Sequence, residues 1–256
     1  SCMRKMEHSM NSRQQAILTV VAQSQKTDVA SLAERFGVSQ VTIRQDLRAL
    51  EDAGRIRRYH GGAMPLSQDD MNSRLAINYE VKLAIAREAA SLVDNGESVL
   101  IESGSTNVLL AMALAEKRGV TIITNSVFIC RQLRGMHRVK VVLLGGDYQH
   151  ESEVLVGPLT RKSLQSFHVD KFFVGSDGFS PDMGFTCNDL QRAEVARAMA
   201  ERANKIIVVT DSSKFNQQGV ASQFSAEEVD IVITDRNLSL AQQESLGRFS
   251  IAVKMV

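Results

Sequence analysis

The stretch Val38-Ser39-Gln40-Val41-Thr42-Ile43-Arg44-Gln45-Asp46-Leu47 decides the fold of the first part of the chain. Ser39 is a residue type that caps helix N-termini. Apolar residues follow it at the spacing of one helix face, namely Ile43, Leu47 and Leu50. The stretch therefore predicts a helix from Gln40 to about Ala53. Its outward face carries Val41, Gln45 and Arg48, flanked by Thr42 and Arg44.

Two more helices are predicted before this one. Asn11 and Ser12 can cap a helix that continues to Val21, and a short helix over 29–36 ends at Gly37. A helix, a tight turn and a second helix form a helix-turn-helix, whose later helix enters the DNA major groove. Gln and Arg read base edges there, and Ser and Thr suit phosphate oxygens. The predicted DNA contacts on this helix are Ser39, Gln40, Val41, Thr42, Arg44, Gln45 and Arg48.

A basic hairpin is predicted directly after the third helix. Residues 54–63 alternate apolar and basic side chains and end in Gly61-Gly62. Such a wing can reach a phosphate strand or the minor groove, here through Arg57, Arg58 and His60. The alternative is a three-helix domain whose polar face is only solvated. The Gly37 turn, the Ser39 cap and the hairpin, in this order, favour DNA binding, while Gln14 is interpreted as ordinary surface.

Charge divides the chain in the same way. Residues 1–65 hold ten Lys and Arg against six Asp and Glu, a net of +4, and residues 66–256 hold twenty against twenty-three, a net of −3. A basic segment on a slightly acidic body indicates that only the segment meets a polyanion. At 256 residues the chain has room for about two domains. We expect a DNA-binding domain over 10–65, a polar linker over 66–80 and an α/β domain over 81–256.

Composition excludes several classes of protein. With 44% hydrophobic and 23% charged residues, the chain is too apolar to be disordered. Its apolar runs are far short of the ~20 residues of a membrane span, and its first residues lack the apolar segment of a secretory signal. Cys2, Cys130, Cys187 and the five His have no ligand spacing. We expect a cytoplasmic protein that contacts no membrane and holds no metal and no cofactor.

The second part alternates strands and helices, which predicts a mainly parallel sheet covered on both faces. A helix is predicted over 79–93. The predicted strands are Ser98–Ile101, Val120–Thr124, Val139–Leu144, Lys171–Gly175, Lys205–Thr210, Ile231–Thr234 and Ser250–Val253. The predicted helices between them are Asn107–Lys117, Val127–Leu133, Leu159–Ser166, Leu190–Ala203 and Leu240–Leu246. Ligands of such sheets bind beyond the carboxyl ends of the strands.

Polar clusters follow several of these strands. Hydroxyls and a glycine at the start of a helix favour phosphate binding, and such groups occur in Ser103-Gly104-Ser105-Thr106 and in Thr124-Asn125. Glycines permit the close approach of a ligand to the backbone, as in Gly145-Gly146. Other strand ends carry the carboxylates of Asp177 and Asp211 and the ammonium group of Lys214. Each cluster alone is typical of an ordinary turn, but together they favour a small anionic ligand. Neither GxGxxG nor GxxxxGK[ST] is present, which argues against a dinucleotide or a P-loop nucleotide.

These residues together resemble the DeoR-type family of bacterial transcription regulators from Asn11 onward. The resemblance lies in residues 38–47, in Arg58-Tyr59-His60-Gly61-Gly62-Ala63 and in the strand-end stretches, together with Val156-Gly157-Pro158 and Ile233-Thr234-Asp235. It implies a winged helix-turn-helix joined to a ribose-phosphate-isomerase-like α/β sensor domain. It also implies an effector that is a phosphorylated sugar or a related metabolite. The implied effector residues are Ser103, Gly104, Ser105, Thr106, Thr124, Asn125, Gly145, Gly146, Asp177, Glu194 and Lys214.

Two residues depart from the family pattern. Gln45 stands where the family usually has Arg, and Glu102 where it often has Asp. Because Gln prefers adenine and Arg prefers guanine, the first departure indicates a different operator. The second leaves the fine geometry of the effector pocket open.

We expect a dimeric or tetrameric DNA-binding transcription regulator, a repressor of sugar-utilisation genes rather than an enzyme. Its partners would be operator DNA, the metabolite and further copies of itself. The rival hypothesis is a sugar-phosphate isomerase with an accessory DNA-binding domain, with Asp177, Glu194, Asp211 and Lys214 as general acids and bases. A third hypothesis is a metabolite-independent DNA-organising protein.

Overall fold

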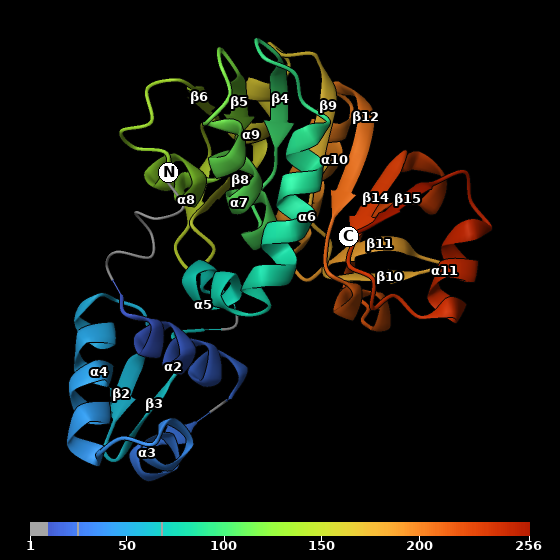
Figure 1. Ribbon diagram of the computed structural model, residues 1–256. Helices are drawn as coiled ribbons and strands as arrows, with labels where there is room; N and C mark the ends of the chain where they lie inside the picture. Colours follow the sequence, from blue (N-terminus) through green and yellow to red (C-terminus); the bar gives the residue numbers. More distant parts are fainter. Residues whose placement is uncertain (1–9, 25, 68) are drawn as a thin grey trace. The chain divides into compact units, whose positions relative to one another are not determined.

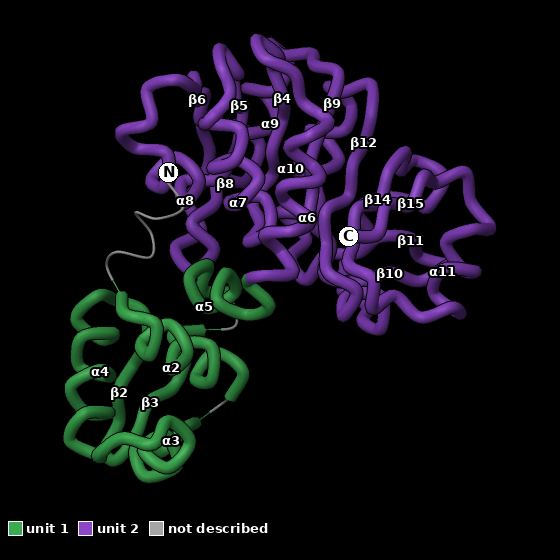
Figure 2. The backbone as a smooth tube through the Cα atoms, in the orientation of Figure 1, with its two compact units in different colours: residues 1–79 green, residues 80–256 purple. Residues whose placement is uncertain are grey.

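The computed structural model describes residues 10–24, 26–67 and 69–256. Cys2 and the first residues, on which the expectation about a secretory signal depends, lie outside this part, as do Gln25 and Gln68. The chain divides into two compact units, one ending at Tyr79 and one running from Glu80 to Val256 (Figure 2). The predicted domain bounds of 10–65 and 81–256 stay a prediction.

The first unit is a winged helix-turn-helix, which confirms the predicted fold (Figure 1). The helices of this motif are α2 (Ser12–Gln23), α3 (Val29–Phe36) and α4 (Gln40–Asp52). Its sheet has the order β1-β3-β2, with β1 at Thr27–Asp28, β2 at Arg57–Tyr59 and β3 at Gly62–Met64. Asn11, Asp28 and Ser39 cap the three helices with their side chains. Gly37 ends α3 with a φ of 63°, a left-handed conformation that glycine adopts without strain.

Apolar side chains of all three helices and of the hairpin form the core of this unit. The predicted stripe of α4, Ile43, Leu47 and Leu50, is at most 1% exposed. It packs in one cluster with Ile17 and Leu32 of the other helices. Because one stripe of α4 is buried in this way, the side chains on the opposite face of the helix, among them Val41, Gln45 and Arg48, are exposed.

The polar linker expected over 66–80 contains a short helix that the sequence did not predict. Helix α5 (Met71–Ala76) is capped by Asp70, whose Oδ1 accepts a hydrogen bond of 2.8 Å from the N–H of Ser73. Met71 is fully buried, and the hydroxyl of Thr19 on α2 donates to the carbonyl of Ala76. Ala76 also belongs to the apolar core of the first unit, so tertiary contacts, including those with α2, hold this short segment.

The second unit is built around a seven-stranded sheet in the order β15-β14-β12-β9-β4-β5-β6 (Figure 1). All of its pairs are parallel, and every strand corresponds to a predicted one, which confirms the α/β class. The strands are β4 (Ser98–Ile101), β5 (Thr121–Thr124), β6 (Lys140–Leu143), β9 (Val169–Val174), β12 (Ala203–Val209), β14 (Ile231–Thr234) and β15 (Ala252–Met255).

Helices alternate with these strands, as predicted. They are α6 (Tyr79–Ser91), α7 (Ser105–Leu114), α8 (Val127–Gln132), α9 (Pro158–Leu164), α10 (Leu190–Ala200), α11 (Leu240–Gly247) and the 3₁₀ turns η1 (Ser212–Asn216) and η2 (Ala226–Glu228). Five short strands carry no signal in the sequence analysis: β7 (Asp147–Gln149), β8 (Val154–Val156), β10 (Gly178–Ser180), β11 (Gly184–Cys187) and β13 (Ala221–Phe224). They are too short for an alternating pattern to stand out.

The strand order reverses between β4 and β9. The chain runs outward from β4 through β5 to β6, and then continues on the other side of β4 with β9, β12, β14 and β15. Parallel sheets leave a crevice for ligands beyond the carboxyl ends of the strands at such a point. The loops after Ile101 and Val174 therefore become candidates for the effector site.

Within the described ranges, no helix combines the length and the apolar character needed to cross a bilayer. The same part of the chain shows no group of three or more His, Cys, Asp or Glu side chains arranged to hold a metal ion.

Candidate DNA interface and effector site

The outward face of α4 carries the predicted base-contacting residues. Gln45 and Arg48 are exposed, and Val41 is 61% exposed. An exposed valine beside polar side chains can contact the methyl group of thymine. Arg44 is also exposed and donates through Nη2 to Oε1 of Gln40, 3.1 Å away and one helical turn earlier. The predicted placement of this face is confirmed, and the base contacts stay a prediction.

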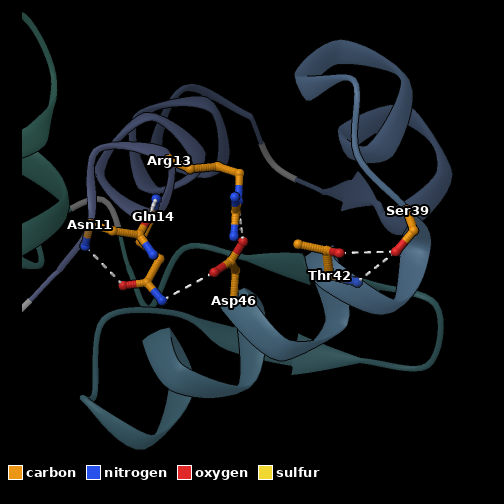
Figure 3. Close-up of polar contacts among 6 residues, drawn as sticks. All are labelled: Asn11, Arg13, Gln14, Ser39, Thr42 and Asp46. Carbon is orange, nitrogen blue, oxygen red and sulfur yellow. Dashed lines mark hydrogen bonds and ion pairs between the residues drawn. The ribbon is translucent and has the colours of Figure 1, made fainter.

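The hydroxyls at the start of α4 already have partners. Ser39 Oγ accepts a hydrogen bond of 3.1 Å from the N–H of Thr42 and lies 2.9 Å from Thr42 Oγ1 (Figure 3). Ser39 therefore satisfies a backbone group that the first turn of a helix leaves without a partner. A DNA phosphate that contacts these two hydroxyls would bind groups that already take part in the helix cap.

A cluster of Arg13, Gln14 and Asp46, which we call the Asp46 cluster, is absent from the sequence analysis. Asp46 lies on α4 and is only 4% exposed. Its Oδ2 accepts a hydrogen bond of 2.6 Å from Arg13 Nε, and its Oδ1 accepts one of 3.1 Å from Gln14 Nε2 (Figure 3). The hydrogen bond from Arg13 to Asp46 raises the pKa of the guanidinium. The interpretation of Gln14 as ordinary surface is therefore wrong.

The wing is a two-stranded hairpin in which Tyr59 pairs with Gly62 across the turn His60-Gly61. Arg57 and His60 are exposed. Arg58 is held against α4, because its N–H donates to Oε1 of Glu51 over 2.9 Å and its Nη1 lies 3.6 Å from Glu51 Oε2. Of the two wing arginines, Arg57 is thus the better candidate for a phosphate contact.

The carboxyl ends of β4 and β5 bring together six predicted effector residues, which we call the strand-end cluster. They are Ser103, Gly104, Ser105, Thr106, Thr124 and Asn125, and all are buried. The N–H of Ser103 donates to Oδ1 of Asn125 over 3.3 Å, and Asn125 Nδ2 donates to the carbonyl of Leu155 on β8 over 3.1 Å. The short hairpin of β7 and β8 is therefore joined to this edge of the sheet.

Two buried polar atoms beside this cluster have no hydrogen-bond partner among the residues that the structure describes. They are Oγ of Ser103 and Oδ1 of Asn107. Asn107 was not among the predicted effector residues, and its Nδ2 donates to the carbonyl of Glu102 over 2.8 Å. Buried polar atoms normally have partners, and the free N–H groups at the start of α7 favour negative charge. The arrangement can bind a small molecule that carries both hydroxyl and anionic groups.

The glycines Gly145 and Gly146 have a structural explanation of their own. Gly146 has a φ of 153°, and a Cβ on it would lie 2.6 Å from the carbonyl oxygen of Val156 and closer still to Thr160 Oγ1. Thr160 Oγ1 in turn donates to the carbonyl of Gly145 over 2.6 Å. Packing against α9 and β8 therefore requires glycine at 146, and the effector role of both residues stays a prediction.

The predicted carboxylates Asp177, Asp211 and Glu194 each have a contact within the protein. Asp177 Oδ2 accepts from the N–H of Asn188 over 3.0 Å, and Asp211 caps η1. Glu194 is exposed on α10, pairs with Arg161 of α9 over 2.6 Å and lines a groove of about 600 Å³ formed by residues 158–165 and 194–202. Glu194 is thus engaged in an ion pair at the surface, and its effector role stays a prediction.

Lys214 lies half-buried on η1, which Asp235 holds in place. Asp235 Oδ1 accepts from the N–H of Ser212 over 2.7 Å, and its Oδ2 accepts from the hydroxyl of Ser212 over 2.9 Å. Burial acts to raise the pKa of Asp235, but these hydrogen bonds and one from the N–H of Asn237 outweigh it, so the pKa lies below its ordinary value. Asp235 therefore positions the turn that carries the ammonium group.

Comparison with known proteins gives the same two-part organisation. The family model described as "DeoR-like helix-turn-helix domain" matches residues 13–69, and "DeoR C terminal sensor domain" matches residues 77–236. The HTH-type transcriptional regulator GolR of Listeria innocua is 33% identical, covering 95% of this chain and 97% of that protein. The transcriptional repressor AccR of Agrobacterium fabrum is also 33% identical, covering 89% and 90%.

Solved structures match the chain more distantly. Ribose 5-phosphate isomerase A of Methanocaldococcus jannaschii matches with a TM-score of 0.40 and 21% sequence identity, covering 54% of this chain and 55% of that one.

Proposed function

The chain belongs to the DeoR family of transcription regulators, and we propose that it is a repressor of sugar-utilisation genes. In this proposal, a phosphorylated sugar or related metabolite controls its affinity for the operator. AccR, a relative at 33% identity, is named a repressor. The strand-end cluster is the proposed effector site. Its unpartnered Ser103 Oγ and Asn107 Oδ1 beside the N-terminus of α7 are the observation that carries this proposal.

Each group of the site has a role in the proposal. Ser103, Ser105, Thr106 and the first N–H groups of α7 bind the phosphate, because a helix N-terminus with hydroxyl side chains favours an anion. Asn107 and Asn125 bind sugar hydroxyls, since an amide can both donate and accept. Lys214 adds a positive charge from η1.

In the proposed DNA complex, α4 lies in the major groove with Gln45 and Arg48 toward base edges, while Arg57 of the wing contacts phosphate. Two copies of the chain read paired half-sites. Effector binding changes the spacing or orientation of the two DNA-binding domains. The metabolite must therefore bind one arrangement more tightly than the other, typically by about 1–3 kcal/mol of coupling.

The test uses a duplex that the wild-type protein selects from a random-sequence library. Its affinity is measured at fixed salt with and without a panel of sugar phosphates, and one of them is expected to shift it by about 5- to 150-fold. Lys214→Ala should abolish this shift and leave DNA binding without effector unchanged. Lys140→Ala, which removes the same charge at the opposite end of the sheet, is the matched control. If no sugar phosphate shifts the affinity, the sensor proposal is wrong.

The isomerase alternative finds less support. An isomerase needs carboxylates free for proton transfer, but Asp211 caps η1 and Glu194 forms a surface ion pair. The relatives that match over nearly the whole chain are transcription regulators. Incubation with ribose 5-phosphate and an assay for ribulose 5-phosphate distinguishes the two, and turnover would favour the enzyme.

A further inference from the structure

A buried carboxylate lies on α4 between two of the proposed base-contacting residues. Asp46 is 4% exposed, although Gln45 before it and Arg48 two positions later are exposed. An ionised side chain is costly to bury unless charged or hydrogen-bonding groups surround it. The Asp46 cluster supplies such groups to both carboxylate oxygens.

The two partners of Asp46 come from the first turn of α2, more than 30 residues earlier in the chain. Arg13 Nε and Gln14 Nε2 donate to different oxygens of the carboxylate, over 2.6 and 3.1 Å (Figure 3). Two donors on two oxygens restrict the direction of the carboxylate as well as its distance. The cluster therefore restrains both the rotation of α4 about its axis and its shift along α2.

Gln14 itself is held at both ends of its amide. Its Oε1 accepts from the N–H of Asn11 over 3.2 Å, while its own N–H donates to Asn11 Oδ1 over 2.8 Å (Figure 3). With Oε1 occupied by a donor, Nε2 is the end that faces Asp46. The capping box of α2 thus continues by hydrogen bonds into α4.

Apolar packing alone leaves the angle of α4 less well defined. Contacts of Ile43 and Leu47 with the core decide which face is buried, but hydrophobic attraction has no direction. Reading a base edge with two hydrogen bonds depends on a narrow geometry. We propose that the Asp46 cluster is a positioning device that sets the rotation of α4, so that it determines sequence discrimination rather than general affinity for DNA.

This inference rests on the proposed placement of α4 in the major groove, and its test uses the full chain. The probes are the duplex selected by the wild-type protein and a scrambled duplex of the same composition, both at fixed salt. Asp46→Asn keeps the side-chain shape and removes the charge. Its affinity for the selected duplex should fall about tenfold, the effect of one lost base contact. Its affinity for the scrambled duplex should stay equal or rise, because a negative charge near the phosphates is gone.

The matched control is Asp52→Asn, which removes a carboxylate from the exposed end of the same helix. This variant should bind both duplexes with equal or higher affinity and keep the wild-type ratio between them. Arg13→Ala should lower the ratio as Asp46→Asn does, whereas Arg35→Ala, an exposed arginine of α3, should not. The double variant Arg13→Ala/Asp46→Asn should be no worse than Asp46→Asn, because residues that act as one unit are not additive.

Loss of folded protein would lower the apparent affinity for both duplexes by one factor, so the ratio separates positioning from stability. Gln14→Ala, which removes the hydrogen bond to Asp46 and the one accepted from the N–H of Asn11 but no charge, gives the same test if Asp46→Asn fails to fold. The proposal is overturned if these variants keep the wild-type ratio. If the wild-type protein selects no sequence at all, the proposed placement of α4 fails, and this inference fails with it.

Discussion

Asn125, at the end of β5, accepts a hydrogen bond of 3.3 Å through Oδ1 from the N–H of Ser103 at the end of β4. The same side chain donates through Nδ2 to the carbonyl of Leu155 on β8. One buried amide therefore joins three segments around the proposed effector site.

Asn125→Ala should lower the free energy of unfolding of the second unit by roughly 2 kcal/mol, because it leaves the buried N–H of Ser103 and carbonyl of Leu155 without this partner. Urea denaturation followed by circular dichroism measures the change. Asn237→Ala, at an exposed asparagine whose hydrogen bond to Asp235 comes from its backbone N–H, is the control and should change stability by less than about 0.5 kcal/mol. Equal effects of the two substitutions would contradict this prediction.

Gly146→Ala should destabilise the protein by about 1–3 kcal/mol or more, because the new Cβ meets Val156 and Thr160 and the φ of 153° disfavours a side chain. Gly247→Ala provides the comparison, since a Cβ at the end of α11 meets nothing within 4 Å. This second variant should be unchanged or up to about 1 kcal/mol more stable. Thermal unfolding of both variants in the absence of effector is the measurement. If glycine at 146 were needed only for ligand binding, Gly146→Ala would leave the stability of the ligand-free protein unchanged.

Arg57→Ala should weaken binding to selected and scrambled duplexes alike and reduce the slope of log affinity against log salt by about 1, as expected for a lost phosphate contact. Arg48→Ala should instead cost about 1–3 kcal/mol on the selected duplex and relax the preference at one base position. Fluorescence anisotropy titrations at several salt concentrations measure both. If Arg57→Ala changes discrimination and Arg48→Ala does not, the roles assigned to the helix and the wing are reversed.

Asp235→Asn should lower the free energy of unfolding at pH 7. The pKa of Asp235 in the folded protein lies below its ordinary value of 3.8. Its stabilising contribution is therefore complete above the unfolded pKa and is lost as the pH falls through the folded one. The difference from wild type should narrow in urea titrations repeated at pH values from 7 down to below 3.8. Asp182→Asn, at an exposed position, is the control and should change stability at pH 7 by less than about 0.5 kcal/mol. A stability difference between Asp235→Asn and wild type that stays constant with pH would refute the assignment.

Sequence periodicity was sufficient for α2, α3, α4 and the strands of the seven-stranded sheet, but not for α5, the five short strands or many of the contacts between elements. The spacing of Ile43, Leu47 and Leu50 predicts both the helix and its buried face, because helical periodicity is a local property. The clusters after β4 and β5 could be predicted to converge, since the carboxyl ends of neighbouring parallel strands share one edge. Glu194 shows the limit of this argument, because a position on α10 carries no such constraint.

By itself, the sequence determined the winged helix-turn-helix, the parallel sheet and the exposed face of α4, because caps, turns and apolar spacing act over a few residues. Only the tertiary structure decided that Arg13 and Gln14 meet Asp46, that Asn125 meets Ser103, and that α5 is ordered against α2. Such contacts join segments that lie 22 to 57 residues apart. These contacts depend on how whole helices and strands pack, so no local sequence pattern predicts them.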